Sequence, residues 1–230
     1  MSSPVLHRTR SFAKDAAQLI VEAARAALEQ RGLFRLGLAG GNTPKIVHQE
    51  LVQIGATLPW DKVLITFGDE RCVPPDHPDS NYRMARESLL TQVPIAEKNV
   101  FRIRGEIDPA IAAAECEEQL DAVALNQGES IYTHDLLLLG MGEDGHTASL
   151  FPSSPALDES VRRVIPTIGP KPPPQRITFT YPLINASRSI LFLVNDPTKE
   201  PVVEAVLRGE FPAGKVRPSH GQVTWLLGER

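Results

Sequence analysis

Three runs of β-forming residues, at 34–38, 62–67 and 135–139, each end in a loop rich in glycine or in charged side chains. Helical stretches separate these runs. In residues 12–31, for example, alanine and isoleucine recur at three- and four-residue steps. Such alternation of strands and helices predicts a largely parallel sheet with helices on both faces. We therefore expect an α/β, Rossmann-like fold that gathers the three loops at the carboxyl edge of the sheet, where such folds bind ligands.

The rest of the chain continues the alternation. Further helices are expected near 44–53, 80–91 and 108–126, and further strands near 98–103, 176–180, 190–194 and 222–227. The proline-rich stretch 169–174 is typical of a stiff loop between strands, and no linker-like or repetitive segment divides the sequence. We therefore expect a single domain over residues 1–230.

The composition indicates in which compartment the protein works and which class of partner it binds. The net charge of -4 argues against nucleic acid as the main partner, so an anionic ligand would need a locally positive pocket. No apolar run approaches the roughly 20 residues that span a bilayer. Cys72 and Cys116 lack the spacing of a metal site, which favours a reducing cytoplasm. We expect a cytoplasmic protein with neither a membrane association nor an obligate protein partner.

The loop after the third run, residues 140–149, carries the side chains that are most capable of taking part in a reaction. Its three glycines allow a tight turn that contains Asp144 and His146. A capped turn with a hydrogen-bonded histidine is the plain structural alternative. The density of glycines around an ionisable pair at the end of a buried strand instead favours a functional site.

The loop after the first run, Gly40-Gly41-Asn42-Thr43, precedes Pro44 and a helical stretch. Asn42 or Thr43 can serve as the N-cap, and proline suits the first turn. Free backbone N–H groups at such a helix start favour an anion, typically phosphate. A plain helix cap remains the alternative, since neither Walker nor dinucleotide-binding glycine spacing is present.

The loop after the second run contains Gly68, Asp69, Glu70 and Arg71. Charged residues at the end of a strand are often ordinary solvated surface. Their position after a buried strand favours an orientation toward the same crevice as the other two loops.

Together the motifs resemble the 6-phosphogluconolactonase family, within the wider group that includes glucosamine-6-phosphate deaminase. The matching segments are Gly37–Pro44, Phe67–Arg71, Ser80–Tyr82, Gly140–Pro152, Arg176–Thr178 and Lys199. Asp-Glu-Arg at 69–71 and Thr-Ala-Ser at 147–149 favour the lactonase branch. One departure is Asn42, where the family more often has serine, and this change keeps a side-chain acceptor.

The resemblance implies hydrolysis of 6-phospho-D-glucono-1,5-lactone to 6-phosphogluconate, the second step of the oxidative pentose phosphate pathway. This chemistry requires no metal, cofactor or covalent nucleophile. His146 is the candidate general base, because an imidazole titrates near neutrality. Asp144 is expected to orient the loop or the imidazole. Asp69 and Arg71 are expected to position substrate hydroxyls or to polarise the ester oxygens.

The resemblance also implies a binding site for the 6-phosphate. The expected residues are Gly40, Gly41, Asn42, Thr43 and Lys199, with Arg176 assisting. Lys199 lies where prolines signal the start of a helix, a position that costs a cation about 0.3–1 kcal/mol. A bound phosphate would remove this conflict, whereas projection of the lysine into water is the structural alternative.

Two other functions share parts of this pattern. An aminosugar-phosphate deaminase–isomerase would use the same phosphate loop and histidine, but with different residues after Phe67 and His146. A sugar-phosphate sensor would add a helix-turn-helix, for which the residues before the first strand offer no second helix. Ser149 lacks the Gly-x-Ser-x-Gly setting of a hydrolase nucleophile. His48 is expected near the surface and His134 just before a strand, each structural or solvated.

Overall fold

The computed structural model describes residues 3–229, which are built around a six-stranded sheet whose neighbouring strands are all parallel. In spatial order its strands are β1 (Val5–Thr9), β9 (Gln222–Gly228), β8 (Ser189–Val194), β5 (Leu136–Leu139), β2 (Phe34–Leu38) and β3 (Val63–Phe67). The predicted largely parallel α/β sheet is confirmed. β1 was not predicted from the sequence, because its residues are mostly exposed and carry no strong apolar pattern.

A second, antiparallel sheet stands beside the first. It consists of β4 (Asp69–Arg71), β7 (Gln175–Phe179) and β6 (Val164–Ile168), in that order. The charged residues 69–71, expected as a loop, are therefore a short strand paired with β7. The strand expected near 98–103 is wrong, because this segment makes one isolated bridge, from Val100 to Ile65, and no continuous ladder.

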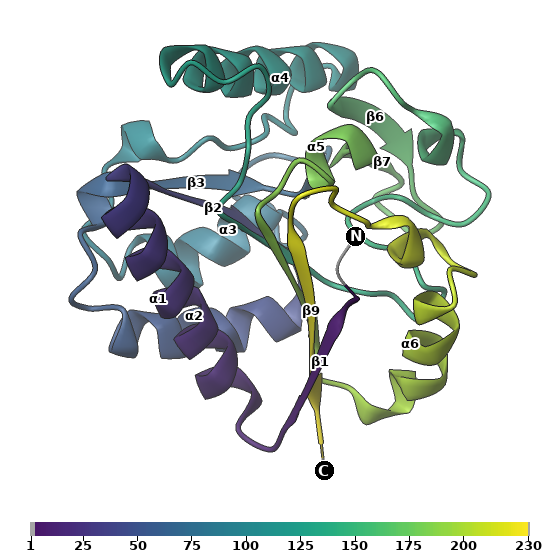
Figure 1. Cartoon of the computed structure of the whole chain (residues 1–230). Coiled ribbons are helices and arrows are strands. Elements are labelled where there is room, and N and C mark those ends of the chain that lie inside the picture. The colour runs from purple at the N-terminus through teal and green to yellow at the C-terminus, as the bar shows by residue number, and fades with distance from the viewer. Residues whose placement is uncertain (1–2, 230) are drawn as a thin grey trace.

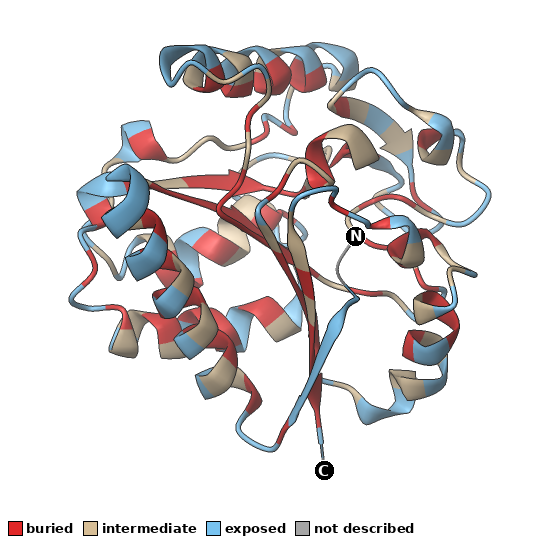
Figure 2. Ribbon diagram, in the orientation of Figure 1, coloured by how far each residue is buried: buried red, intermediate tan, exposed pale blue. Residues whose placement is uncertain are grey.

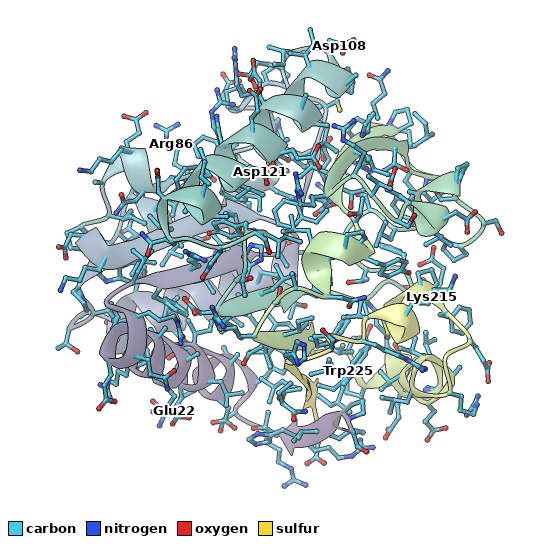
Figure 3. All side chains as sticks on the ribbon, turned by 45° about the horizontal axis from the view of Figure 1, so that its top comes forward. Glu22, Arg86, Asp108, Asp121, Lys215 and Trp225 are labelled. Atoms are coloured by element: carbon cyan, nitrogen blue, oxygen red, sulfur yellow. The ribbon has the colours of Figure 1, made fainter. Side chains whose placement is uncertain are left out.

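The helices are α1 (Phe12–Arg31), α2 (Asn42–Ile54), α3 (Asn81–Ala85), α4 (Pro109–Asn126), α5 (Tyr181–Ile184) and α6 (Glu200–Leu207). α1 and α2 pack together on one side of the parallel sheet, and α4 and α6 lie on the other (Figure 1). At the start of α4, the carboxylate of Asp108 accepts hydrogen bonds from two free N–H groups of the first turn (Figure 3). None of the helices in the described part of the chain has both the length and the apolar character to cross a membrane.

The core lies between these layers. Every residue of β2 and of β5 is buried, and the strands of the parallel sheet other than β1 form the buried centre of Figure 2. The rings of Phe192 and Trp225 stack face to face with centroids 3.9 Å apart. Each large apolar side chain buried in this way stabilises the fold by about 1.5–3 kcal/mol.

Two histidines belong to this core. His48 and His134 are both fully buried, so the surface position expected for His48 is wrong. It lies on the inner face of α2, where its Nδ1 is 2.8 Å from the hydroxyl of Ser88. Nε2 of His134 lies 2.8 Å from the hydroxyl of Thr66. Burial lowers the pKa of His48 to about 4 and that of His134, next to the charge of Arg35, to about 3.

The order of the strands explains where the loops meet. From β2, the chain continues to β3 on one side, while β5 and then β8 pair on the other side. Parallel sheets bind ligands where the order of the strands reverses in this way. The segments that follow these four strands begin at Ala39, Gly68, Gly140 and Asn195.

Candidate functional site

Two adjoining cavities lie among these segments. Both are lined by Asp69, Arg71, Gly142, His146 and Ala148. The smaller, of about 160 Å³, is completed by backbone and side chains from all three loops, among them Gly40 and Asn81. The larger, of about 510 Å³, is completed by Asp144, Ser149, Lys171, Arg176, Lys199 and their neighbours. The structure therefore brings seven of the ten sequence-predicted site residues to one place.

The Asp144–His146 pair is the centre of this arrangement. Oδ1 of Asp144 lies 2.5 Å from Nδ1 of His146 and also accepts a 3.3 Å hydrogen bond from the backbone N–H of that histidine. Burial alone would raise the pKa of Asp144, but its hydrogen bond to His146 and the charge of that ring lower the pKa below its ordinary value. A carboxylate bound to Nδ1 fixes the orientation of the imidazole and leaves Nε2 as the nitrogen for chemistry.

Gly142 allows this pair to form. A Cβ at Gly142 would overlap the imidazole of His146 and a carboxylate oxygen of Asp144. The two ends of the turn are also joined, because the N–H of Gly142 donates to the carbonyl of His146 at 3.0 Å. On its other side, the imidazole packs on Phe151 with ring centroids 4.6 Å apart. The glycine is therefore required by close packing of the acid–base pair against the backbone.

Asp69 is held by two donors from different segments. The hydroxyl of Ser149 donates to Oδ2 at 2.6 Å, and Nδ2 of Asn81 donates to Oδ1 at 3.0 Å. The same Asn81 amide donates to the backbone carbonyl of Asp69 at 2.9 Å. The Asn81 side chain lies so close to Gly40 that any Cβ there would collide with it. These contacts join the loops after β2, β3 and β5.

Glu70 is a functional residue that sequence reasoning missed. Its buried carboxylate accepts hydrogen bonds from the N–H groups of Arg71, Asn81 and Tyr82 and from the hydroxyl of Ser80. Burial raises the pKa of Glu70, although the three N–H groups oppose that shift. The carboxylate fixes the turn that presents its neighbours to the cavities. The Ser-Asn-Tyr motif was visible in the sequence, but its partner was not.

Positive charge gathers at the larger cavity. Arg71 and Arg176 occupy paired positions on β4 and β7, and Lys171 and Lys199 line the same cavity. Within residues 3–229, Nε of Arg71 and Nη1 of Arg176 are buried and have no hydrogen-bond partner. Burial lowers the pKa of Arg176, and the neighbouring charge of Arg71 lowers it further. Buried donors and mutual repulsion of this kind favour a bound anion.

Lys199 directly precedes α6, as expected, and its ammonium group donates to the carbonyl of Met141 at 2.8 Å. This contact turns the side chain toward the loop of His146. The structural alternative of projection into water is therefore wrong, and the lysine is part of the cavity wall.

The glycine loop after β2 is placed differently from the other predicted segments. Gly40 lines the smaller cavity, but in the described chain Gly41, Asn42 and Thr43 line neither of the two cavities. The expected cap by Asn42 or Thr43 is also wrong. Gly41 precedes the helix with a φ of 98°, a conformation that glycine adopts readily, and no side chain caps the first turn.

The acidic, histidine and cysteine side chains do not form a metal-binding cluster of three or more anywhere within residues 3–229. The side chains that line the cavities and can take part in a reaction are those of the acid–base pair, of Asp69 and of the basic residues.

Comparison with known proteins identifies relatives along nearly the whole chain. A sequence model of the family described as glucosamine-6-phosphate isomerases/6-phosphogluconolactonase matches residues 7–225. The 6-phosphogluconolactonase of Nostoc sp. is 40% identical over 215 residues, which are 91% of this chain and 88% of the relative. That of Homo sapiens is 39% identical over 222 residues, which are 93% of this chain and 85% of the relative.

Solved structures give the same result. The 6-phosphogluconolactonase of Thermotoga maritima matches with a TM-score of 0.89 and 26% identity, over 99% of this chain and 100% of that one. The enzyme of the same name from Trypanosoma brucei matches with a TM-score of 0.85 and 30% identity, over 99% and 97%. The chain belongs to the glucosamine-6-phosphate isomerase/6-phosphogluconolactonase family.

Proposed function

We propose that this chain hydrolyses 6-phospho-D-glucono-1,5-lactone to 6-phospho-D-gluconate, in the oxidative pentose phosphate pathway. The observation that carries the proposal is the Asp144–His146 pair, which lines the larger cavity together with Arg71, Arg176 and Lys199. One cavity thus offers both a base and the positive charge that a phosphorylated substrate needs. Relatives about 40% identical that are named 6-phosphogluconolactonase support the same reaction.

In the proposed mechanism His146 acts as general base. Its Nδ1 is engaged by Asp144, so Nε2 accepts a proton from a water molecule as the water oxygen bonds to C1 of the lactone. The tetrahedral intermediate then collapses, and the bond between C1 and the ring oxygen breaks. The imidazolium returns its proton to that oxygen, which becomes the C5 hydroxyl. The new carboxylic acid releases its own proton to solvent at neutral pH.

The basic side of the larger cavity is the proposed phosphate site. A phosphate there would accept hydrogen bonds from Nε of Arg71 and Nη1 of Arg176 and would relieve the repulsion between the two guanidinium groups. Lys199 adds a third charge. Binding the phosphate at a distance from C1 orients the carbonyl toward His146. The segment Gly40–Thr43 at the start of α2 remains a predicted part of the same phosphate site, with Lys199 and Arg176.

A cytoplasmic setting completes the proposal. It is supported by the free thiols of Cys72 and Cys116 and by the net charge of -4, which also argues against a nucleic-acid partner.

The test is a direct assay. The lactone is generated in place by glucose-6-phosphate dehydrogenase, and its loss above the spontaneous rate is followed with the wild type and with His146→Ala, in the presence of EDTA. We expect rapid, EDTA-insensitive loss with the wild type and almost none with the variant. Binding of 6-phosphogluconate, measured by calorimetry, should persist in His146→Ala and so confirm that the site is intact.

Near-normal turnover by His146→Ala would refute the assignment of the base. Absence of acceleration by the wild type would refute the lactonase function itself, and glucosamine 6-phosphate would then be the next substrate to assay.

A further inference from the structure

We propose that Ser149 is a positioning residue, which fixes the carboxylate of Asp69 as the acceptor for a hydroxyl group of the sugar ring. The inference rests on the proposed function, since it describes how the same site recognises its substrate. Its basis is the 2.6 Å hydrogen bond from the Ser149 hydroxyl to Oδ2 of Asp69, opposite the 3.0 Å bond from Asn81 to Oδ1.

The hydrogen bonds to Asp69 hold its carboxylate in one orientation. A carboxylate has about four acceptor positions, and the two donors from Ser149 and Asn81 occupy one on each oxygen. With each oxygen held by a different segment, rotation of the carboxylate would break one of the bonds. Asp69 lines both cavities, so its remaining acceptor positions are available to a polyhydroxylated ligand. An acceptor oriented before binding loses less freedom when the ligand arrives.

Ser149 is itself rigidly held. Its side chain is buried, and its backbone N–H donates to the hydroxyl of Thr178 on β7 at 3.1 Å. The residue before it, Ala148, has a φ of 47°, a left-handed conformation that non-glycine residues rarely adopt. Such a strained backbone persists only where the surroundings determine it, which is common at functional sites. This backbone conformation directly precedes the residue whose hydroxyl contacts Asp69.

The contact also connects the loop of the proposed base with the proposed acceptor of the sugar hydroxyl. Ser149 lies three residues after His146 on the loop that follows β5, whereas Asp69 begins β4. The bond between them therefore sets the distance from the base to the acceptor of the sugar hydroxyl. In the proposal the Ser149 hydroxyl holds this carboxylate, and the oxygen that attacks the lactone is that of water.

The first experiment compares Ser149→Ala with wild type in the lactonase assay, with Ser160→Ala, an exposed serine, as the matched control. We expect the KM for 6-phospho-D-glucono-1,5-lactone to rise about tenfold while kcat stays within about twofold, because an acceptor left unfixed weakens a charge-assisted hydrogen bond. If Ser149→Ala does not fold, Ser149→Cys, which keeps the volume but has a weak donor, takes its place.

The decisive experiment is a double-mutant cycle with Asp69→Asn, measured as the Kd of 6-phosphogluconate by calorimetry. If Ser149 acts through Asp69, adding Ser149→Ala to Asp69→Asn changes the Kd by less than about twofold. Multiplication of the two single effects would overturn the proposal. So would a loss confined to kcat, since Ser149 would then take part in bond making. A wild type that binds 6-phosphogluconate without lactonase activity would refute the proposed function, while the cycle would still test the contact.

Discussion

Replacement of His48 by leucine should make the protein markedly more resistant to acid. His48 is fully buried, and its pKa of about 4 compares with 6.5 for an exposed histidine. The unfolded chain therefore binds a proton more strongly than the folded one. Burial of the neutral His48 costs no stability above pH 6.5. The free energy of unfolding then falls as the pH drops from 6.5 toward 4.

The size of the effect follows from the two pKa values. Between pH 8 and pH 5, protonation of His48 in the unfolded chain lowers the free energy of unfolding by about 2 kcal/mol. His134, with a pKa of about 3, contributes about the same over that interval, so the two histidines together account for about 4 kcal/mol. His48→Leu should remove about half of this dependence.

The local structure makes leucine a suitable replacement. The hydroxyl of Ser88, which contacts His48, also donates to the carbonyl of Met84 at 2.7 Å. Loss of the imidazole therefore leaves that donor satisfied. Nε2 of His48 is buried and, within the described residues, has no partner, so its loss removes an unsatisfied polar atom from the core.

The assay is urea unfolding of the wild type and of His48→Leu at half-unit steps from pH 5 to pH 8. The variant should lose about 2 kcal/mol less than the wild type across this range, whatever its stability at pH 8. Other acid-sensitive groups, including Asp144, are common to both proteins and cancel in the comparison. Equal pH dependence in the two proteins would refute the reasoning.

Two further predictions concern the site. Gly142→Ala should reduce kcat at least tenfold with little change in melting temperature, because the added methyl group displaces the ring of His146 and not the core; retention of full kcat would contradict this account. Arg176→Met should raise the KM for the phosphorylated lactone about tenfold or more and leave that for gluconolactone nearly unchanged, because the guanidinium is assigned to the phosphate. An equal effect on both substrates would exclude Arg176 from the phosphate site.

The parallel sheet could be predicted because each of its central strands is an apolar run with a glycine or charged residue at its end. The second, antiparallel sheet could not be predicted from the sequence. β4 is three residues long, and all of them are charged, so that neither length nor hydrophobic pattern identifies it. Its conformation depends on pairing with β7, more than a hundred residues away. The exposed edge strand β1 was missed for a similar reason, since its pairing with β9 is also remote in sequence.

The candidate site, like the fold, could be predicted from the sequence only in part. Asp144 and His146 lie two residues apart in one glycine-rich turn, so local sequence was sufficient to propose them as a pair. The partners of Asp69 were out of reach, because Ser149 is 80 residues away. In the sequence Ser149 is part of a family motif and lacks the setting of a nucleophile, but nothing there indicates a contact with Asp69. The role of Glu70 was equally hidden, since a charged residue beside two others gives no sign that it alone is buried.

The pairing of β1 with β9 has a consequence for how the chain is made. Val5 lies beside Thr224, so β1, which precedes the other strands of the described chain, has its partner in β9, which follows them. The exposed apolar side chains of Val5 and Leu6 belong to a strand that has no partner until β9 has been synthesised. The segments that line the site follow β2, β3, β5 and β8, and none of them follows β1. The docking of β1 therefore has to wait for β9.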